Sequence, residues 1–264
     1  MLEISSSTHP DLLLDSSVVP IKPREQGFIS APDGTSLYYE VHGEGKPLLF
    51  CYGLTCRREH WHHQLSHYAQ THQVILFDYR GHHASGIPKN DQNLTLEWCA
   101  RDVGAVVKHL GLKEVVLFGH SMGVPIVAET MHLIPKQVKA AVFICGAVTN
   151  PFKHMFSSSR MEFVYQLYSR LHFVAPDTVS LLWRRMTSRS WFSHFLTSRL
   201  GFNPTHSNAS DVHSYLDGVH DTPWQVFFSL ISDYTRYDGR RLLKEINCPV
   251  LVIAGRREIG RAHV

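Results

Sequence analysis

The sequence lacks a charge excess of either sign, and its first residues lack a long hydrophobic run. Its 26 basic and 23 acidic side chains give a formal net charge of +3 over 264 residues, so the total charge predicts neither a nucleic-acid-binding protein nor a membrane-surface protein. Residues 1–24 contain no apolar stretch longer than Leu12–Leu14, which is too short for a signal peptide or a transmembrane helix. We therefore expect an irregular N-terminal arm over residues 1–24, no membrane partner and no nucleic-acid partner.

Cysteines are few and isolated, which argues against a disulfide framework. The five thiols, an odd number, are scattered singly along the chain, and four of them lie inside apolar runs. This pattern is typical of reduced, buried thiols in a cytoplasmic protein. The cysteines are Cys51, Cys56, Cys99, Cys145 and Cys248.

Clusters of metal ligands are also scarce, although residues 57–71 contain four histidines. His63 and His67 are one helical turn apart, a spacing that two zinc ligands can have. A zinc site needs three or four ligands and outer groups that orient them, and no carboxylate or cysteine partner accompanies this pair. We interpret the segment as a solvated helix face that carries His60, His62, His63 and His67, and we expect no metal and no cofactor.

The sequence does contain 44% hydrophobic residues, which is ample for the core of one α/β domain with an insertion. Alternating side chains over 26–30 and 35–42 predict a hairpin. Short buried strands then alternate with helical patterns up to about residue 149, which predicts a mostly parallel sheet with helices on both faces. Strands are expected at 48–51, 74–77, 113–119, 140–145 and 248–255, and helices at 57–71, 95–110 and 125–134.

Residues 115–124 form the segment that points to chemistry, because an apolar, strand-like run ends there in Gly119-His120-Ser121-Met122-Gly123. A bare Gly-x-Ser-x-Gly pattern arises by chance in on the order of one chain in ten of this length. The context makes it specific, since a strand signal precedes it and a helical signal follows it. Such a turn exposes the serine hydroxyl at a helix N-terminus, where backbone amides favour developing negative charge.

Two further motifs complete a family pattern. Residues 52–55 read Tyr-Gly-Leu-Thr after one buried strand, and residues 78–85 read Asp-Tyr-Arg-Gly-His-His-Ala-Ser after the next. Together with the Ser121 segment, they make the chain resemble the α/β-hydrolase family over roughly residues 25 to 258. Tyr52 stands where the family usually has His, and His83 stands where it usually has Gly. A left-handed backbone at His83 is costlier than at glycine, but it is not forbidden.

The resemblance implies the α/β-hydrolase fold, with core segments over residues 25–149 and 238–264. It also implies that the insert over residues 150–237 is a helical cap that covers the active site. Aromatic side chains are frequent in this insert. We expect most of them to pack the cap against the sheet domain, and the rest to line a pocket for an apolar substrate moiety.

The resemblance further implies residue roles. Ser121 is expected to be the nucleophile, the backbone amides of Leu54 and Met122 the oxyanion donors, and Glu258 the triad acid. The family's base is a histidine that follows one further strand, whereas only His263 follows position 258 here. That separation is too short to form a strand and return to Ser121. We therefore expect a C-terminally truncated chain without the catalytic histidine, the last strand and the last helix.

For the parent protein, the resemblance implies a serine hydrolase that transfers the acyl group of small or medium apolar esters to water. Lipase, thioesterase, lactonase, carbon–carbon bond hydrolase and perhydrolase activities stay open within the same fold, whereas Ser121 argues against epoxide hydrolases and haloalkane dehalogenases, which use Asp at this turn. For the truncated chain we expect little hydrolase activity, and poor solubility because the 248–255 strand forms an exposed apolar edge. The alternatives are a non-catalytic ligand-binding protein of this fold and a fragment with no function of its own. The expected partner is a small-molecule ester or other acyl compound.

Overall fold

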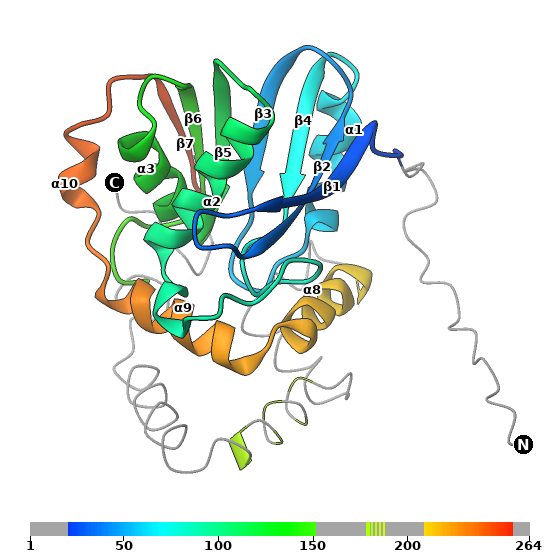
Figure 1. Ribbon diagram of the computed structural model, residues 1–264, viewed down its shortest axis with the longest axis vertical. Coiled ribbons are helices and arrows are strands. Elements are labelled where there is room, and N and C mark those ends of the chain that lie inside the picture. The colour runs from blue at the N-terminus through cyan, green and yellow to red at the C-terminus, as the bar shows by residue number, and fades with distance from the viewer. Residues whose placement is uncertain are drawn as a thin grey trace, which may run out of the picture.

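The computed structural model describes residues 21–151 and 209–255, together with residues 178, 179, 181, 183, 185 and 187. Its centre is a seven-stranded sheet in the order β1-β2-β4-β3-β5-β6-β7 (Figure 1). The expected strands are confirmed to within two residues at each end. They are β1 (Glu25–Ser30), β2 (Ser36–His42), β3 (Lys46–Cys51), β4 (His72–Phe77), β5 (Val115–His120), β6 (Val138–Ile144) and β7 (Val250–Ile253).

The sheet is mostly parallel, as the sequence predicts. The β1–β2 hairpin is antiparallel, with Ile29 opposite Leu37, and β2 is also antiparallel to β4. The other neighbouring pairs are parallel. The inner strands are apolar on both faces because helices cover both, so Leu49, Phe50 and Ile75 are fully buried.

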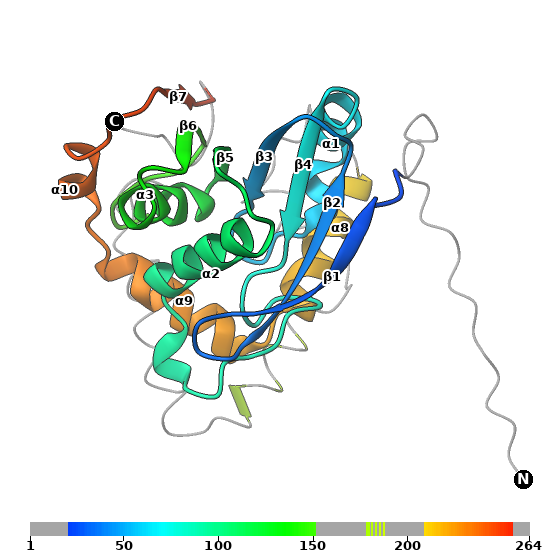
Figure 2. The same cartoon turned by 45° about the horizontal axis from the view of Figure 1, so that its top comes forward.

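Helices cover the two faces of the sheet. The chain forms a short 3-10 turn, η1 (Arg58–Trp61), then α1 (His62–Tyr68), a second turn, η2 (Asp91–Asn93), α2 (Leu96–His109) and α3 (Gly123–Leu133). Helices α2 and α3 pack on one face and α1 lies on the other (Figure 2). Thr95 caps α2 by accepting a hydrogen bond from the Trp98 amide at 3.2 Å, and Gly111 ends the segment with a φ of 62°. Both features follow the helix start and stop signals of the sequence.

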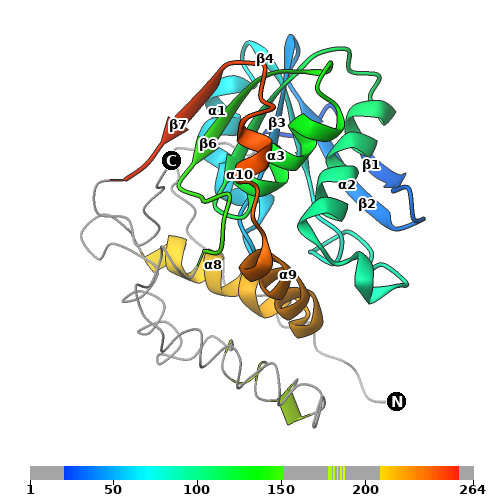
Figure 3. The same ribbon diagram turned by 90° about the vertical axis from the view of Figure 1, so that its left-hand side faces the viewer.

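Helices α8 (Ala209–Asp221) and α9 (Trp224–Arg236) run across the edge where β3, β4 and β5 end (Figures 1 and 3). Asp233 of α9 accepts a hydrogen bond from the Leu96 amide at 2.8 Å, and the Tyr234 hydroxyl donates to the Ala147 carbonyl at 2.7 Å. These two helices belong to the insert for which the sequence predicts a helical cap. Most of the insert before residue 209 lies outside the described residues.

The last strand, β7, forms one edge of the described sheet, and α10 (Arg240–Leu243) precedes it. Its side chains Leu251, Val252 and Ile253 are 58%, 39% and 44% exposed. The expectation of an apolar edge at this strand therefore holds within the described residues.

The cysteine expectation needs a correction. All five thiols are free, but only Cys51, Cys56 and Cys99 are buried, whereas Cys145 and Cys248 are half-buried. The last two lie beside β7 at the edge of the sheet, where fewer side chains cover them. In the described ranges, no helix combines the length and the apolar character needed to cross a membrane. Of the predicted N-terminal arm, residues 1–20 lie outside the described residues.

Candidate active site

Ser121 lies on the sharp turn between β5 and α3, with a positive φ of 54°. Two glycines make this turn possible. A Cβ at Gly119 would lie 2.6 Å from the Gly123 carbonyl oxygen, and a Cβ at Gly123 would lie 2.2 Å from the Cys51 carbonyl oxygen. Both distances are far below van der Waals contact, so only glycine lets β5 turn into α3 this closely against β3. Ser121 itself is half-buried, at the N-terminus of an 11-residue helix.

The turn that follows β3 packs directly on Ser121. A Cβ at Gly53 would lie 3.0 Å from the Ser121 Cβ and 3.4 Å from its hydroxyl oxygen. The two strands are parallel neighbours, with Cys51 opposite Gly119, so their carboxyl ends reach the same place. The structure thus brings together the Ser121 turn and the 52–55 segment that the sequence singled out.

Turn hydrogen bonds hold the two peptide groups that contain the Leu54 and Met122 amides. The Cys56 amide donates to the Gly53 carbonyl at 3.0 Å, and the Val124 amide donates to the Ser121 carbonyl at 3.0 Å. In a planar trans peptide the N–H points opposite to the C=O, so these two bonds also fix the directions of the Leu54 and Met122 N–H groups. Among the described loop residues, neither amide donates a backbone hydrogen bond, which leaves both available for an acceptor.

Tyr52 and Tyr79 brace the start of this turn with reciprocal hydrogen bonds. The Tyr79 hydroxyl donates to the Tyr52 carbonyl at 3.1 Å, and the Tyr79 amide donates to the Tyr52 hydroxyl at 3.1 Å. The Tyr52 hydroxyl donates to Asp78 Oδ1 at 3.3 Å. Burial, with the Asp78 carboxylate nearby, raises the pKa of Tyr52 well above its usual value, so the hydroxyl stays protonated and able to donate. The sequence has Tyr52 where the family usually has His, but no sequence pattern predicts this link between β3 and β4.

The loop after β4 braces the same edge of the sheet. Asp78 is fully buried and accepts from Arg58 Nη1 at 2.6 Å and from the Ala84 amide at 3.1 Å. Burial raises the pKa of the Asp78 carboxyl, and the Arg58 guanidinium opposes that rise. His83 adopts the left-handed φ of 44° that the family pattern gives to glycine, and its Nε2 lies 2.8 Å from the Cys56 carbonyl oxygen. A hydrogen bond therefore accompanies the strained backbone at this position.

His60 contradicts the expectation of a solvated histidine face. Its Nδ1 accepts from the Arg57 amide at 3.0 Å, and its Nε2 lies 3.1 Å from Ser214 Oγ on α8. Because Nδ1 accepts, the neutral ring carries its proton on Nε2 and donates it to Ser214. Burial lowers the pKa of His60 to about 4. The covering helix lies far away in the sequence, so a local pattern could not reveal it, whereas His63 and His67 are exposed as predicted.

Like His83, the neighbouring His82 contacts a backbone carbonyl. His82 is fully buried, and its Nδ1 lies 3.2 Å from the Arg80 carbonyl oxygen. Burial lowers the pKa of His82 to about 3, so the ring is neutral at pH 7. Within the part of the chain that the structure describes, no three or more side chains form a cluster suited to a metal ion.

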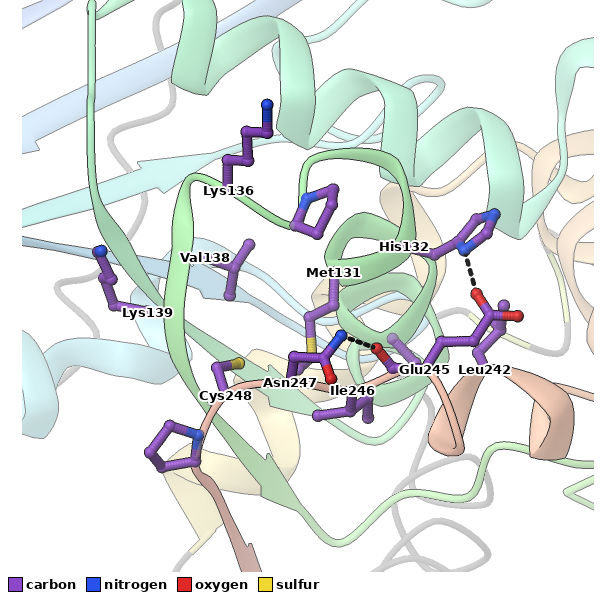
Figure 4. Close-up of a pocket in the computed structure, with 13 residues that line it drawn as sticks. Met131, His132, Lys136, Val138, Lys139, Leu242, Glu245, Ile246, Asn247 and Cys248 are labelled. Carbon is purple, nitrogen blue, oxygen red and sulfur yellow. Dashed lines mark hydrogen bonds and ion pairs between the residues drawn. The ribbon is translucent and has the colours of Figure 1, made fainter.

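The predicted triad acid, Glu258, and also His263 lie outside the described residues. A hollow of about 270 Å³ is present elsewhere, between the C-terminal end of α3, the start of β6 and residues 242–249 (Figure 4). His132 Nδ1 lies 2.6 Å from Glu245 Oε2 at its rim. This hollow lies where the strands begin, and Ser121 is not among the residues that line it.

The chain is similar in sequence to known proteins of several activities. The chain is 38% identical to a non-heme haloperoxidase of Rhodococcus erythropolis over 97 residues, which are 36% of this chain and 35% of that protein. It is 22% identical to the bifunctional epoxide hydrolase 2 of Mus musculus over 209 residues, which are 78% of this chain and 38% of that protein. The matches thus span little more than a third of either relative's own length.

A solved structure, the esterase of Exiguobacterium antarcticum, superposes with a TM-score of 0.65 at 18% identity, covering 85% of this chain and 79% of that one. This likeness concerns the fold alone. A family model described as alpha/beta hydrolase fold matches residues 46–259. That match includes the strands β3 to β7, the Ser121 turn and both bracing loops, so the chain belongs to the alpha/beta hydrolase fold family.

Proposed function

We propose that this protein is a serine hydrolase that transfers the acyl group of an ester to water. The Ser121 oxygen attacks the ester carbonyl carbon, and a general base takes the hydroxyl proton. The carbonyl oxygen carries the negative charge of the tetrahedral intermediate and accepts hydrogen bonds from the Leu54 and Met122 amides. The bond to the leaving alcohol then breaks, and the alcohol receives the proton. Water repeats these steps on the acyl-enzyme and releases the carboxylic acid.

One observation carries this proposal: Ser121 is held at a positive φ on a glycine-flanked turn, packed against Gly53. Strained backbone conformations persist where the surrounding structure holds them, and they cluster at active sites. The carbonyls of Ser121 and Gly53 are both occupied by turn hydrogen bonds. This arrangement supports the assignment of the next amide in each turn as an oxyanion donor.

The acid and the base of the triad remain proposals. We assign the acid to Glu258, on the resemblance alone, and the base to a histidine of the parent protein that follows the acid in the family's order. Two described histidines at this edge are already engaged, since His60 uses both ring nitrogens and His83 Nε2 contacts a carbonyl oxygen. We predict that the 264-residue chain hydrolyses esters slowly. A direct measurement of ester turnover tests this.

An apolar acyl or alcohol group is the favoured substrate moiety. Trp183, Phe227 and Phe228 form an aromatic cluster in the insert, with ring centroids 4.6 to 5.7 Å apart. Such side chains favour an apolar ligand wherever they face a pocket. Epoxide hydrolysis of the kind named for the mouse relative is disfavoured here, because the nucleophile position holds Ser121 where that chemistry uses Asp.

A fluorophosphonate probe tests the proposal, because it phosphonylates an activated serine and places an oxygen between the oxyanion donors. In the parent protein, we expect peptide mapping to locate the adduct on Ser121, and Ser121→Ala to abolish it while the protein remains folded. A folded parent protein left unmodified at Ser121, under conditions that label a control esterase, would sink the catalytic proposal. That outcome would favour the non-catalytic ligand-binding alternative.

A further inference from the structure

The turn after β3, residues 52–55, contains the proposed oxyanion donor Leu54 and is called the oxyanion turn below. It contains a strained residue, Thr55. Its φ is 61°, and it is 1% exposed. A β-branched residue is a clear outlier in this left-handed region, because its side chain crowds the backbone. Such a conformation persists only where neighbouring groups hold it. Thr55 follows Leu54 directly, so whatever holds Thr55 also positions the Leu54 amide.

Helix α8 supplies the contact on the outer side of this turn. A Cβ at Gly218 would lie 2.1 Å from the Thr55 carbonyl oxygen and 3.2 Å from the Arg57 Cγ. The helix backbone therefore rests on the Thr55 carbonyl at a distance that no other residue permits. Glycine inside a helix normally lowers stability. We therefore attribute the glycine at position 218 to the close approach of the helix backbone to the Thr55 carbonyl. Tyr215, one turn earlier, also hydrogen-bonds to the Thr55 side chain.

His60 fixes the position of α8 relative to the same loop. It accepts the Arg57 amide at Nδ1 and donates to Ser214 through Nε2, at 3.0 Å and 3.1 Å. The ring thus joins the backbone two residues after Thr55 to the helix one turn before Gly218. Arg57 also approaches Asp221 at 3.6 Å, but both side chains are partly exposed and this pair contributes little.

We infer that α8 is a clamp on the oxyanion turn, and that Gly218 and His60 are positioning residues that set the direction of the Leu54 amide. This inference rests on the proposed function, since it assigns work to an oxyanion donor. It predicts that a change in α8, away from Ser121, alters the chemical step rather than substrate binding.

The test compares two helical glycine-to-alanine variants. Gly218→Ala places a methyl group against the Thr55 carbonyl, whereas Gly104→Ala in α2 meets nothing closer than 3.9 Å. In the parent protein, saturation kinetics of Ser121 phosphonylation separate the maximal rate from the half-saturating probe concentration. We expect Gly218→Ala to lower the maximal rate by about 100-fold, the scale of a misplaced catalytic group, and to leave the half-saturating concentration within twofold. Gly104→Ala is expected to match the wild type.

Ser214→Ala is the second variant, because it removes the hydroxyl that His60 contacts without adding bulk. We expect the maximal rate to fall about fivefold, as for one lost neutral hydrogen bond, and amide exchange in residues 53–57 to accelerate in both α8 variants. An unchanged maximal rate in folded Gly218→Ala, or a change confined to the half-saturating concentration, overturns the clamp alone. A folded wild-type parent protein that is not labelled at Ser121 overturns the proposed function as well.

Discussion

The two ends of the parallel strands solve the same backbone problem differently. At the carboxyl ends, after β3, β4, β5 and β6, the described left-handed positions are Thr55, Gly81, His83, Ser121 and Cys145, of which only Gly81 is a glycine. At the amino ends, where the chain enters β3 and β5, the described left-handed residues are Gly43, Gly45 and Gly111. The strained non-glycine residues of the described chain therefore gather on one edge of the sheet.

The difference teaches where the fold holds strain. A left-handed residue other than glycine costs roughly 1–2 kcal/mol, and each one at the carboxyl edge has a partner that retains it. Thr55 lies under α8, and His83 contacts the Cys56 carbonyl. The Ser121 amide donates to the Ile144 carbonyl at 3.0 Å, and the Cys145 amide donates to the Ile253 carbonyl at 2.9 Å. At the opposite edge glycine removes the cost, so those turns need no comparable support.

The largest expected effect comes from removing the side chain at the centre of the strained edge. Ser121→Gly deletes the proposed nucleophile and relieves the backbone at φ 54°. We expect fluorophosphonate labelling to disappear and the free energy of unfolding to rise by about 1 kcal/mol. Labelling by mass spectrometry and urea denaturation measure the two effects. Loss of stability with retained labelling would contradict both parts of the comparison.

Next, two glycine-to-alanine variants compare crowding with strain. Gly123→Ala puts a Cβ 2.2 Å from the Cys51 carbonyl oxygen, whereas nothing lies within 4 Å of a Cβ at Gly111. We expect Gly123→Ala to lower the free energy of unfolding by about 3 kcal/mol, as in overpacked cores. Gly111→Ala should cost only about 1 kcal/mol, from its φ of 62°. Equal losses in denaturant titrations would show that packing does not distinguish the edges.

Removal of one hydroxyl should have a smaller effect. Tyr52→Phe leaves the buried Tyr79 amide and Asp78 each without one partner. We expect a loss of about 2 kcal/mol in the free energy of unfolding, because unsatisfied buried groups cost about 1–3 kcal/mol, and slower Ser121 labelling. The matched control is Tyr39→Phe, which loses a hydrogen bond to Glu25 on the β1–β2 hairpin. The rate of Ser121 labelling in Tyr39→Phe should match the wild type. If both variants slowed labelling equally, Tyr52 would have no special role at the Ser121 turn.

The last effect is a pH dependence of stability, which changes the free energy of unfolding by about 1.4 kcal/mol at most for each pH unit. Burial lowers the pKa of His82 to about 3 in the folded protein, whereas the unfolded ring titrates near about 6.5. The unfolded state therefore binds more protons below that pH, so stability is full above about pH 6.5 and falls by up to about 1.4 kcal/mol per pH unit toward pH 3. His82→Asn should reduce this slope, and the exposed control His63→Gln should not. Denaturant titrations of the wild type and both variants at pH 4.5 and 7 measure this slope.

Much of the core was predictable because its signals are local. The buried runs of β3, β4 and β5, the Thr95 cap and the Gly-x-Ser-x-Gly turn are each contained in a few consecutive residues. His60 was misjudged because its partner Ser214 lies 154 positions away. The same holds for Gly218, which no pattern in the insert distinguished. Their importance arises only where α8 meets the turn after β3.

The sequence by itself determined the alternation of strands and helices, the family, and the serine on its glycine-flanked turn, since strand periodicity and glycine permissiveness act over neighbouring residues. Only the tertiary structure decided that Tyr52 joins β3 to β4, that His60 is neutral, and that α8 rests on Thr55. Burial and hydrogen bonding between distant segments control those properties, and they exist only once the parallel strands bring their carboxyl ends to a common edge.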